Sequence, residues 1–252
     1  MRRIFLGLEY DGTAFAGFQR QARGERTVQG VLEEALSKIP GALPKVVAAG
    51  RTDAGVHALE MIVHYDTEDT VPTERVPQAL NTLLPPDVRA LWAREVPQGL
   101  HARKSARWRA YRYRLFNRAE PSALLKNYAL WVPTPLDLSA LEEATRHLIG
   151  EHDFAAFATR EKRGTVREIY AAKVRPVGEE VWLEFVGSGF VRGQVRGMVG
   201  SLLLVAEGKQ RPEWIKELLE SKDRAQAGPT APPQGLYFLA AGYRPWPAAR
   251  VP

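Results

Sequence analysis

In the first hundred residues, segments with the hydrophobic pattern of a strand alternate with segments that have the pattern of a helix. Four short apolar runs bounded by turn residues are typical of strands, and they lie near 2–10, 45–49, 59–66 and 87–96. Two stretches between them carry apolar residues three or four positions apart, which is the spacing of an amphipathic helix. The first lies near 28–39, after Thr27 as a potential N-cap, and the second lies near 73–84. The predicted order is strand, helix, strand, strand, helix, strand.

The second half repeats this order. Predicted strands lie near 109–117, 165–175, 180–187 and 235–243. Predicted helices cover 138–149, a segment that begins near Val191, and a shorter segment after Pro212. Such repetition indicates duplication of a split βαβ unit. We therefore expect an α+β fold of two pseudo-symmetric βαββαβ (ferredoxin-like) halves, 1–103 and 104–252, with a mixed, antiparallel-rich sheet and helices packed on one side.

Composition narrows the class of protein. The chain has 252 residues, of which 45% are hydrophobic, and this is enough for a sizeable core. The N-terminus lacks the apolar region of a signal peptide, and no stretch approaches the roughly 20 uncharged residues of a spanning helix, so we expect a cytoplasmic protein. The absence of cysteine excludes disulfides, thiolate nucleophiles and cysteine-ligated zinc. The five histidines lack the spacing of metal ligands on one face, and no metal site is expected.

The net charge of +6 is compatible with an anionic partner. Residues 101–118 concentrate this charge, with seven Arg or Lys and no acid. Strand alternation places Arg107 and Arg109 on the face that also carries Tyr111 and Tyr113. Rings that stack on bases and guanidinium groups that hold phosphates suit RNA, so Arg107 and Arg109 are candidate RNA contacts. The alternative is a half-buried strand with its rings in the core and its arginines solvated.

A loop between two predicted strands, GRTDAGVH at 50–57, carries Arg51 and Asp53. Asp followed by Ala-Gly is common turn chemistry, which is the structural interpretation. The functional interpretation starts from charge, because Arg192 and Arg196 lie four residues apart on a mostly apolar predicted helix, and a buried arginine needs a partner. Asp53 is a candidate for that partner. An aspartate between two arginines stays ionised, and a positioned carboxylate is a nucleophile or an electrostatic stabiliser.

Seven stretches together resemble the tRNA pseudouridine synthase family of the TruA type, in the family's order and across essentially the whole chain. They are EYDGTAFAGFQRQ, TVQGVLEEAL, AAGRTDAGVHA, LHARKSARWRAYRYRLFN, GEHDFAAF, FVRGQVRGMVGSLL and APPQGLYFLAAGY. The most specific motif is GRTDAGVHA. Seven such stretches in one order leave little room for chance.

This resemblance implies that Asp53 is the catalytic nucleophile and that Arg51 helps to shape the site. It also implies that Tyr111 stacks against the target base, that Arg196 pairs with the catalytic aspartate and that Leu236 lines the pocket. Members of this family are cofactor-free homodimers that modify uridines of the tRNA anticodon stem-loop, at tRNA positions 38 to 40. We therefore expect a homodimer without a cofactor, tRNA bound through its anticodon arm, and an active-site cleft between the two halves.

Three positions depart from the family's pattern. Phe18 stands where tryptophan is usual, Lys104 where an aromatic residue is common, and Gly197 where asparagine is usual. None of the three is an expected site residue, so the expected activity does not change.

The expected reaction breaks the N1–C1′ bond of uridine, turns the base and rejoins it through C5. Asp53 would attack C6 of the ring or C1′ of the ribose, or deprotonate C2′, and the sequence leaves these alternatives open. Two other classes of protein compete with this interpretation. A catalytically silent RNA-binding protein would use the same basic strand. A glycoside or nucleoside hydrolase would need a second carboxylate, for which Glu9 and Asp11 are candidates, and would release free uracil.

Overall fold

The computed structural model describes residues 1–159 and 164–246. Contacts divide the chain into two compact units, and each is described by itself. The first unit contains Met1–Arg107 and Tyr237–Arg244, and the second contains Trp108–Leu236 and the described residues from Pro245 onward. The contacts thus separate the chain after residue 107, whereas the predicted halves meet after residue 103, and most of the last strand belongs to the first unit.

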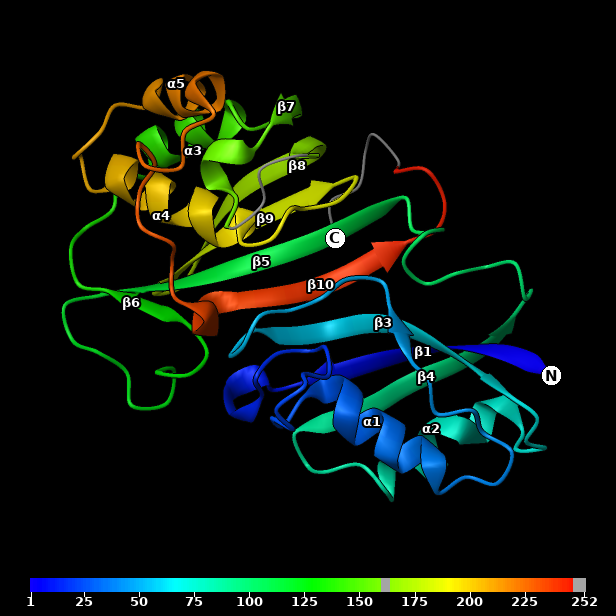
Figure 1. Ribbon diagram of the computed structural model, residues 1–252. Coiled ribbons are helices and arrows are strands. Elements are labelled where there is room, and N and C mark those ends of the chain that lie inside the picture. The colour runs from blue at the N-terminus through cyan, green and yellow to red at the C-terminus, as the bar shows by residue number, and fades with distance from the viewer. Residues whose placement is uncertain (160–163, 247–252) are drawn as a thin grey trace. The chain divides into compact units, whose positions relative to one another are not determined.

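The first unit is built on four strands in the order β4–β1–β3–β10, with the short strand β2 also paired to β3 (Figure 1). Their bounds are Arg2–Tyr10 for β1, Val47–Ala48 for β2, His57–Thr67 for β3, Val88–Val96 for β4 and Leu236–Gly242 for β10. Strand β1 runs antiparallel to both neighbours, and β10 runs parallel to β3. Helices α1 and α2 span Val28–Ser37 and Val76–Asn81. The chain order β1–α1–β2–β3–α2–β4 confirms the order predicted for the first half.

The core of the first unit follows the predicted periodicities. Ile4, Leu6 and Leu8 alternate along β1 and are completely buried. Thr27 caps α1, since its hydroxyl accepts a hydrogen bond from the Gly30 N–H at 3.2 Å. The buried stripe of this helix consists of Val28, Leu32, Ala35 and Leu36. Helix α1 therefore forms where the apolar spacing and the cap predict it.

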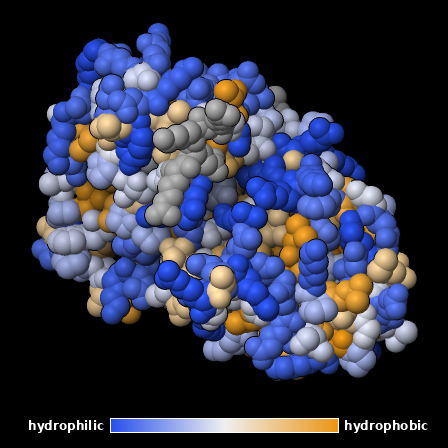
Figure 2. Space-filling model, viewed as in Figure 1, coloured by the Kyte–Doolittle hydropathy of each residue, from blue (hydrophilic) through white to orange (hydrophobic). Residues whose placement is uncertain are grey.

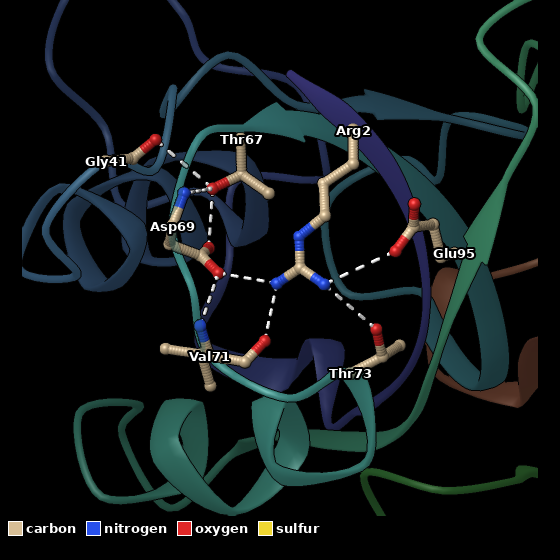
Figure 3. A network of polar contacts seen from close by, with 7 residues as sticks. All are labelled: Arg2, Gly41, Thr67, Asp69, Val71, Thr73 and Glu95. Atoms are coloured by element: carbon tan, nitrogen blue, oxygen red, sulfur yellow. Dashed lines mark hydrogen bonds and ion pairs between the residues drawn. The ribbon is translucent and has the colours of Figure 1, made fainter.

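The start of β1 is fixed by the side chain of Arg2 (Figure 3). Its guanidinium donates to Asp69 at 2.7 Å, to the Val71 carbonyl, to Thr73 at 3.2 Å and to Glu95 at 3.3 Å. Asp69 is itself held by the hydroxyl of a threonine near the end of β3. These bonds tie the N-terminal strand to the segment that leads from β3 towards α2.

The second unit has four antiparallel strands in the order β5–β9–β8–β7, and a short strand β6 runs parallel to β5. Their bounds are Trp108–Asn117 for β5, Leu130–Val132 for β6, Gly150–Asp153 for β7, Val166–Val177 for β8 and Glu180–Gly187 for β9. Three helices, α3, α4 and α5, gather on one side of these strands (Figure 1). They span Leu138–Arg146, Gln194–Ala206 and Trp214–Ser221. The α+β class with mostly antiparallel pairing is confirmed.

The second unit departs from the predicted order in two respects. Strands β6 and β7 were not predicted, because three or four residues are too few to show a period of two. Helix α4 begins at Gln194 rather than near Val191, because Gly193 precedes it in the left-handed conformation with φ 74°. Arg192 therefore lies before the helix, and the prediction that Arg192 and Arg196 share a helical face was wrong.

Apolar residues are a minority on the face of the molecule that Figure 2 shows. The face shown in Figure 2 is mostly hydrophilic, with apolar residues in small groups. Exposed large apolar side chains are spread along the sequence from Met1 to Val177. Among the described residues, no helix has the length and apolar character that crossing a lipid bilayer requires.

Candidate active site

The loop that carries Asp53 connects β2 and β3 in the first unit. Thr52 is buried and Asp53 is half-buried, whereas Arg51 is exposed. The Val56 N–H donates to the Asp53 carbonyl at 3.2 Å, and Gly55 adopts φ 77°, which closes a tight turn directly after Asp53. The turn chemistry predicted from the sequence is therefore present, and it holds Asp53 at the start of the turn.

A second segment of the first unit lies against this turn. The Phe18 N–H donates to the Thr52 carbonyl at 3.0 Å, and the Gly55 N–H donates to the Phe15 carbonyl at 3.3 Å. Phe18 is buried. Its ring fills the core, while its backbone contributes one of the contacts with the Asp53 loop.

Positive charge surrounds the base of the loop. Desolvation, and then the neighbouring charge of Arg103, lower the pKa of the Arg51 guanidinium from its ordinary value. Two guanidinium groups from residues far apart in the sequence therefore lie close together in the first unit. Arg103 was not singled out by the sequence analysis, because only its place in a basic run was visible. Two positive charges held close together favour an anionic ligand.

Tyr111 lies in β5 of the second unit and is buried. Its ring meets Phe190 edge to face, with 4.9 Å between the ring centroids and an interplanar angle of 76°. Such edge-to-face packing is a favourable arrangement of aromatic rings. The structure thus gives Tyr111 a rigid aromatic neighbour, which agrees with a core role and is also what a fixed stacking surface requires.

Arg196 lies in the first turn of α4 and is half-buried. Its Nε donates to the Ala231 carbonyl at 2.7 Å, and the Ala231 N–H donates to the Arg196 carbonyl at 3.0 Å. A backbone carbonyl therefore satisfies one of the five N–H donors of this half-buried guanidinium. The same two bonds anchor the loop that leads to β10.

Tyr113 holds the next part of that loop. Its hydroxyl donates to the Pro232 carbonyl at 2.7 Å, and a Cβ at Gly235 would lie 2.6 Å from its ring. Burial raises the pKa of the Tyr113 phenol, and the nearby positive charge of Arg196 partly opposes this effect. Leu236 follows directly and is buried. The second unit therefore brings Arg196, Tyr113 and Leu236 together, although the sequence indicated Tyr113 only through its alternation with Tyr111.

The arginines on the opposite face of β5 are paired with acids of β9. Arg112 donates to Glu184 at 2.6 and 2.8 Å, and Arg114 donates to Glu180 at 2.6 and 2.7 Å. The predicted alternation of β5 is therefore correct, but these two arginines form ion pairs between adjacent strands. The candidate RNA contacts differ from them. Arg109 donates to the Ser188 carbonyl at 2.9 Å, and Arg107 precedes β5 and is exposed.

Gly197 is a packing position. A Cβ there would lie 2.5 Å from the Phe157 carbonyl oxygen, so glycine allows this backbone to approach α4.

The expected site residues fall into two groups. Asp53 and Arg51 belong to the first unit, and Tyr111, Arg196 and Leu236 belong to the second. The pairing of Asp53 with Arg196 and the expected cleft therefore stay predictions. Among the residues that the structure describes, no group of three or more His, Asp or Glu side chains is placed to hold a metal ion.

Comparison with known proteins shows which family this chain resembles. A family model described as tRNA pseudouridine synthase matches residues 8–103 and 144–244. The tRNA pseudouridine synthase A of Thermus thermophilus is 58% identical over 247 residues, covering 96% of this chain and 97% of that relative. The protein of the same name from Methylococcus capsulatus is 46% identical over 238 residues, covering 94% of this chain and 88% of that relative.

Among solved structures, the crystal structure of a Cbf5–Nop10–Gar1 complex contains a chain that is similar to this one at 11% sequence identity and a TM-score of 0.39. The match covers 94% of this chain and 49% of that chain, so this chain spans about half its length. A TM-score this low indicates only a remote likeness.

Proposed function

The chain belongs to the tRNA pseudouridine synthase family, and from this membership we propose that it is an isomerase that converts uridine to pseudouridine in tRNA. The observation that carries the proposal is the match over residues 8–103 and 144–244, which includes Asp53, Arg196 and Leu236. Tyr111 lies between the two matched segments. In this isomerisation the N1–C1′ bond breaks and a C5–C1′ bond forms, C5 loses its proton to solvent, and N1 takes up a proton from solvent.

Asp53 is the nucleophile in this proposal. The tight turn and the buried Thr52 support it, because they limit the freedom of the carboxylate, and preorganised geometry is a main source of catalytic rate. The positive charges of Arg51 and Arg103 lie close together, and such a concentration of charge suits an anionic substrate. Attack at C6, attack at C1′ and deprotonation of C2′ all remain compatible with this arrangement.

Three residues of the second unit have proposed roles. Tyr111 stacks against the uracil ring and excludes water, and its fixed edge-to-face contact with Phe190 supports that role. Arg196 pairs with Asp53. Leu236 lines the base pocket at the end of a loop that Arg196 and Tyr113 anchor. The buried, apolar character of Leu236 suits contact with the face or edge of a base.

The substrate in this proposal is a uridine of the anticodon stem-loop, and the acting form is a cytoplasmic homodimer. The net charge of +6 supports a polyanionic substrate. Because the target base is stacked, it must be flipped out, which costs a few kcal/mol. Contacts from exposed cations such as Arg107 would offset that cost. The choice of stem-loop and the dimer rest on the sequence resemblance, and the compartment is the expectation stated from the sequence pattern.

The test is tritium release from an unmodified tRNA transcript labelled at uridine C5. We expect release by the wild-type chain, with pseudouridine mapped to the anticodon arm, and at least a thousandfold less release by Asp53→Asn with tRNA binding retained. Asp137→Asn is the matched control, since this aspartate caps α3 through the Ala140 N–H and asparagine caps equally well. Near-normal release by Tyr111→Phe would leave stacking intact and exclude an essential hydroxyl.

Two outcomes would contradict the proposal. Tight tRNA binding without release by the wild-type chain would favour a catalytically silent RNA-binding protein. Free uracil among the products would favour a nucleoside hydrolase.

A further inference from the structure

The residue directly before Asp53 makes a buried hydrogen bond between two side chains. The hydroxyls of Thr52 and Tyr10 lie 2.8 Å apart, and both residues are buried. The carbonyl of Thr52 also accepts the Phe18 N–H at 3.0 Å. Thr52 is thus held through its side chain and through its backbone. Because its peptide leads directly into Asp53, any movement of Thr52 moves the Asp53 carboxylate.

The other end of the same loop is held just as closely. A Cβ at Gly12 would lie 2.0 Å from the Val56 carbonyl oxygen, so only glycine allows this approach. The Gly12 N–H donates to Nδ1 of His57 at 3.0 Å, and the His57 ring stacks on Tyr237 with 4.8 Å between centroids. Segment 10–18 therefore contacts both ends of the turn that presents Asp53.

Tyr10 connects the loop to the end of strand β1. It is the last residue of β1, which lies between β3 and β4. Tyr10 continues the alternation of Leu6 and Leu8 along β1, and like them it is buried, whereas Glu9 is exposed. Its ring lies 6.4 Å from the Phe18 ring, and its hydroxyl reaches Thr52.

A second buried tyrosine shows that the hydroxyl is not required for packing. Tyr65 in β3 is 1% exposed, compared with 3% for Tyr10, and its hydroxyl has no hydrogen-bond partner among the described residues. The first unit thus tolerates a buried tyrosine without a partner. The Tyr10 hydroxyl, in contrast, is directed at the residue adjacent to Asp53.

We propose that Tyr10 is a positioning residue for the isomerisation, acting through its hydrogen bond to Thr52 to fix the Asp53 loop; this rests on the proposed function. Tyr10→Phe keeps the ring and removes the hydroxyl that bonds to Thr52. A displacement of about 1 Å at a catalytic group can reduce the rate about a hundredfold. We expect kcat to fall by about tenfold to a hundredfold. KM changes less than about twofold, because both hydroxyls are buried beneath the loop.

The experiment compares Tyr10→Phe, Thr52→Val and the double variant by steady-state tritium release, with Tyr65→Phe as the matched control. If both single variants break the same hydrogen bond, the double variant loses no more kcat than either single variant. Tyr65→Phe keeps wild-type kcat and KM. The proposal is overturned if Tyr10→Phe behaves like Tyr65→Phe, or if the losses in the double variant multiply.

Amide hydrogen exchange of residues 53–56 is a second measurement that does not depend on turnover. Exchange of the Gly55 and Val56 amides, which donate to Phe15 and Asp53, should accelerate in Tyr10→Phe and stay unchanged in Tyr65→Phe. Lack of activity in the wild-type chain would contradict the proposed function rather than the positioning of the loop. In that case, unaltered exchange in Tyr10→Phe would overturn the positioning role as well.

Discussion

A single buried carboxylate, that of Glu184, contacts two arginines of the second unit, and its replacement by glutamine tests how much this pairing stabilises the fold. The Glu184 side chain is 1% exposed. Its Oε1 accepts from Nε and Nη2 of Arg112 at 2.8 and 2.6 Å. Its Oε2 lies 2.9 Å from Nε of Arg175, but in a geometry that is not a hydrogen bond. The contact with Arg112 is therefore the stronger of the two.

The expected loss follows from what Glu184→Gln removes. Removing one partner of a buried ion pair costs about 3–5 kcal/mol. Glu184→Gln retains part of the interaction, because the glutamine oxygen still accepts a hydrogen bond from Arg112. Arg112 is 18% exposed, and its guanidinium lies 3.9 Å from the centroid of the Trp182 ring. Arg175 is 42% exposed and can be solvated. We therefore expect the free energy of unfolding to fall by about 2 kcal/mol.

Urea-induced unfolding measures this loss, and Glu179→Gln is the matched control. Glu179 pairs with Arg118 at 3.1 Å, but both side chains are exposed, so its replacement should cost no more than about 0.5 kcal/mol. If Glu184→Gln and Glu179→Gln have the same stability within about 0.5 kcal/mol, the buried pair does not stabilise the sheet and the reasoning is refuted.

Two further predictions concern pH and salt. Burial, and then nearby positive charge, lower the pKa of His64 from 6.5 to about 4. The unfolded chain therefore binds this proton more readily than the folded chain does. The free energy of unfolding should fall as the pH drops from 6.5 towards 4, by at most about 3 kcal/mol. His64→Gln, which keeps an acceptor for the Ala102 N–H, should reduce that decline in urea titrations at about pH 7 and pH 5, and an unchanged decline would contradict the assignment. Arg107→Gln should reduce the slope of log Kd for tRNA against log salt concentration by about one. Arg112→Gln should leave this slope unchanged, because Arg112 is already paired with Glu184. Equal slopes for the two variants would contradict this distinction.

The sequence contained enough information for the first unit because its signals are local. Apolar runs bounded by turn residues predicted the strands, and Thr27 with the apolar residues after it predicted α1. In the second unit, the start of α4 depended on the left-handed conformation of Gly193, which neighbouring residues do not indicate. Strands β6 and β7 exist through pairing with β5 and β8, and such pairing is visible only after folding.

The candidate site was predictable to a similar extent. Asp53 could be found because its loop has an unusual composition and matches a specific family motif. Its hydrogen-bonded supports could not, since Tyr10 and Thr52 are 42 residues apart and common in any sequence. The cross-strand pair of Arg112 with Glu184 likewise requires the register of β5 against β9, because a slip of one residue would place them on opposite faces.

The same register changes which cations can serve RNA. Of the seven cations in 101–118, Arg112, Arg114 and Arg118 pair with Glu184, Glu180 and Glu179, which lie in β9 or directly before it. An arginine already paired with a carboxylate releases no counterion when a phosphate approaches. Lys104 and Arg107 are exposed, and neither forms an ion pair with any residue that the structure describes. The charge available to a phosphate backbone therefore lies before β5 rather than along it, which is why Arg107 is a better candidate for tRNA contact than the arginines in the middle of the strand.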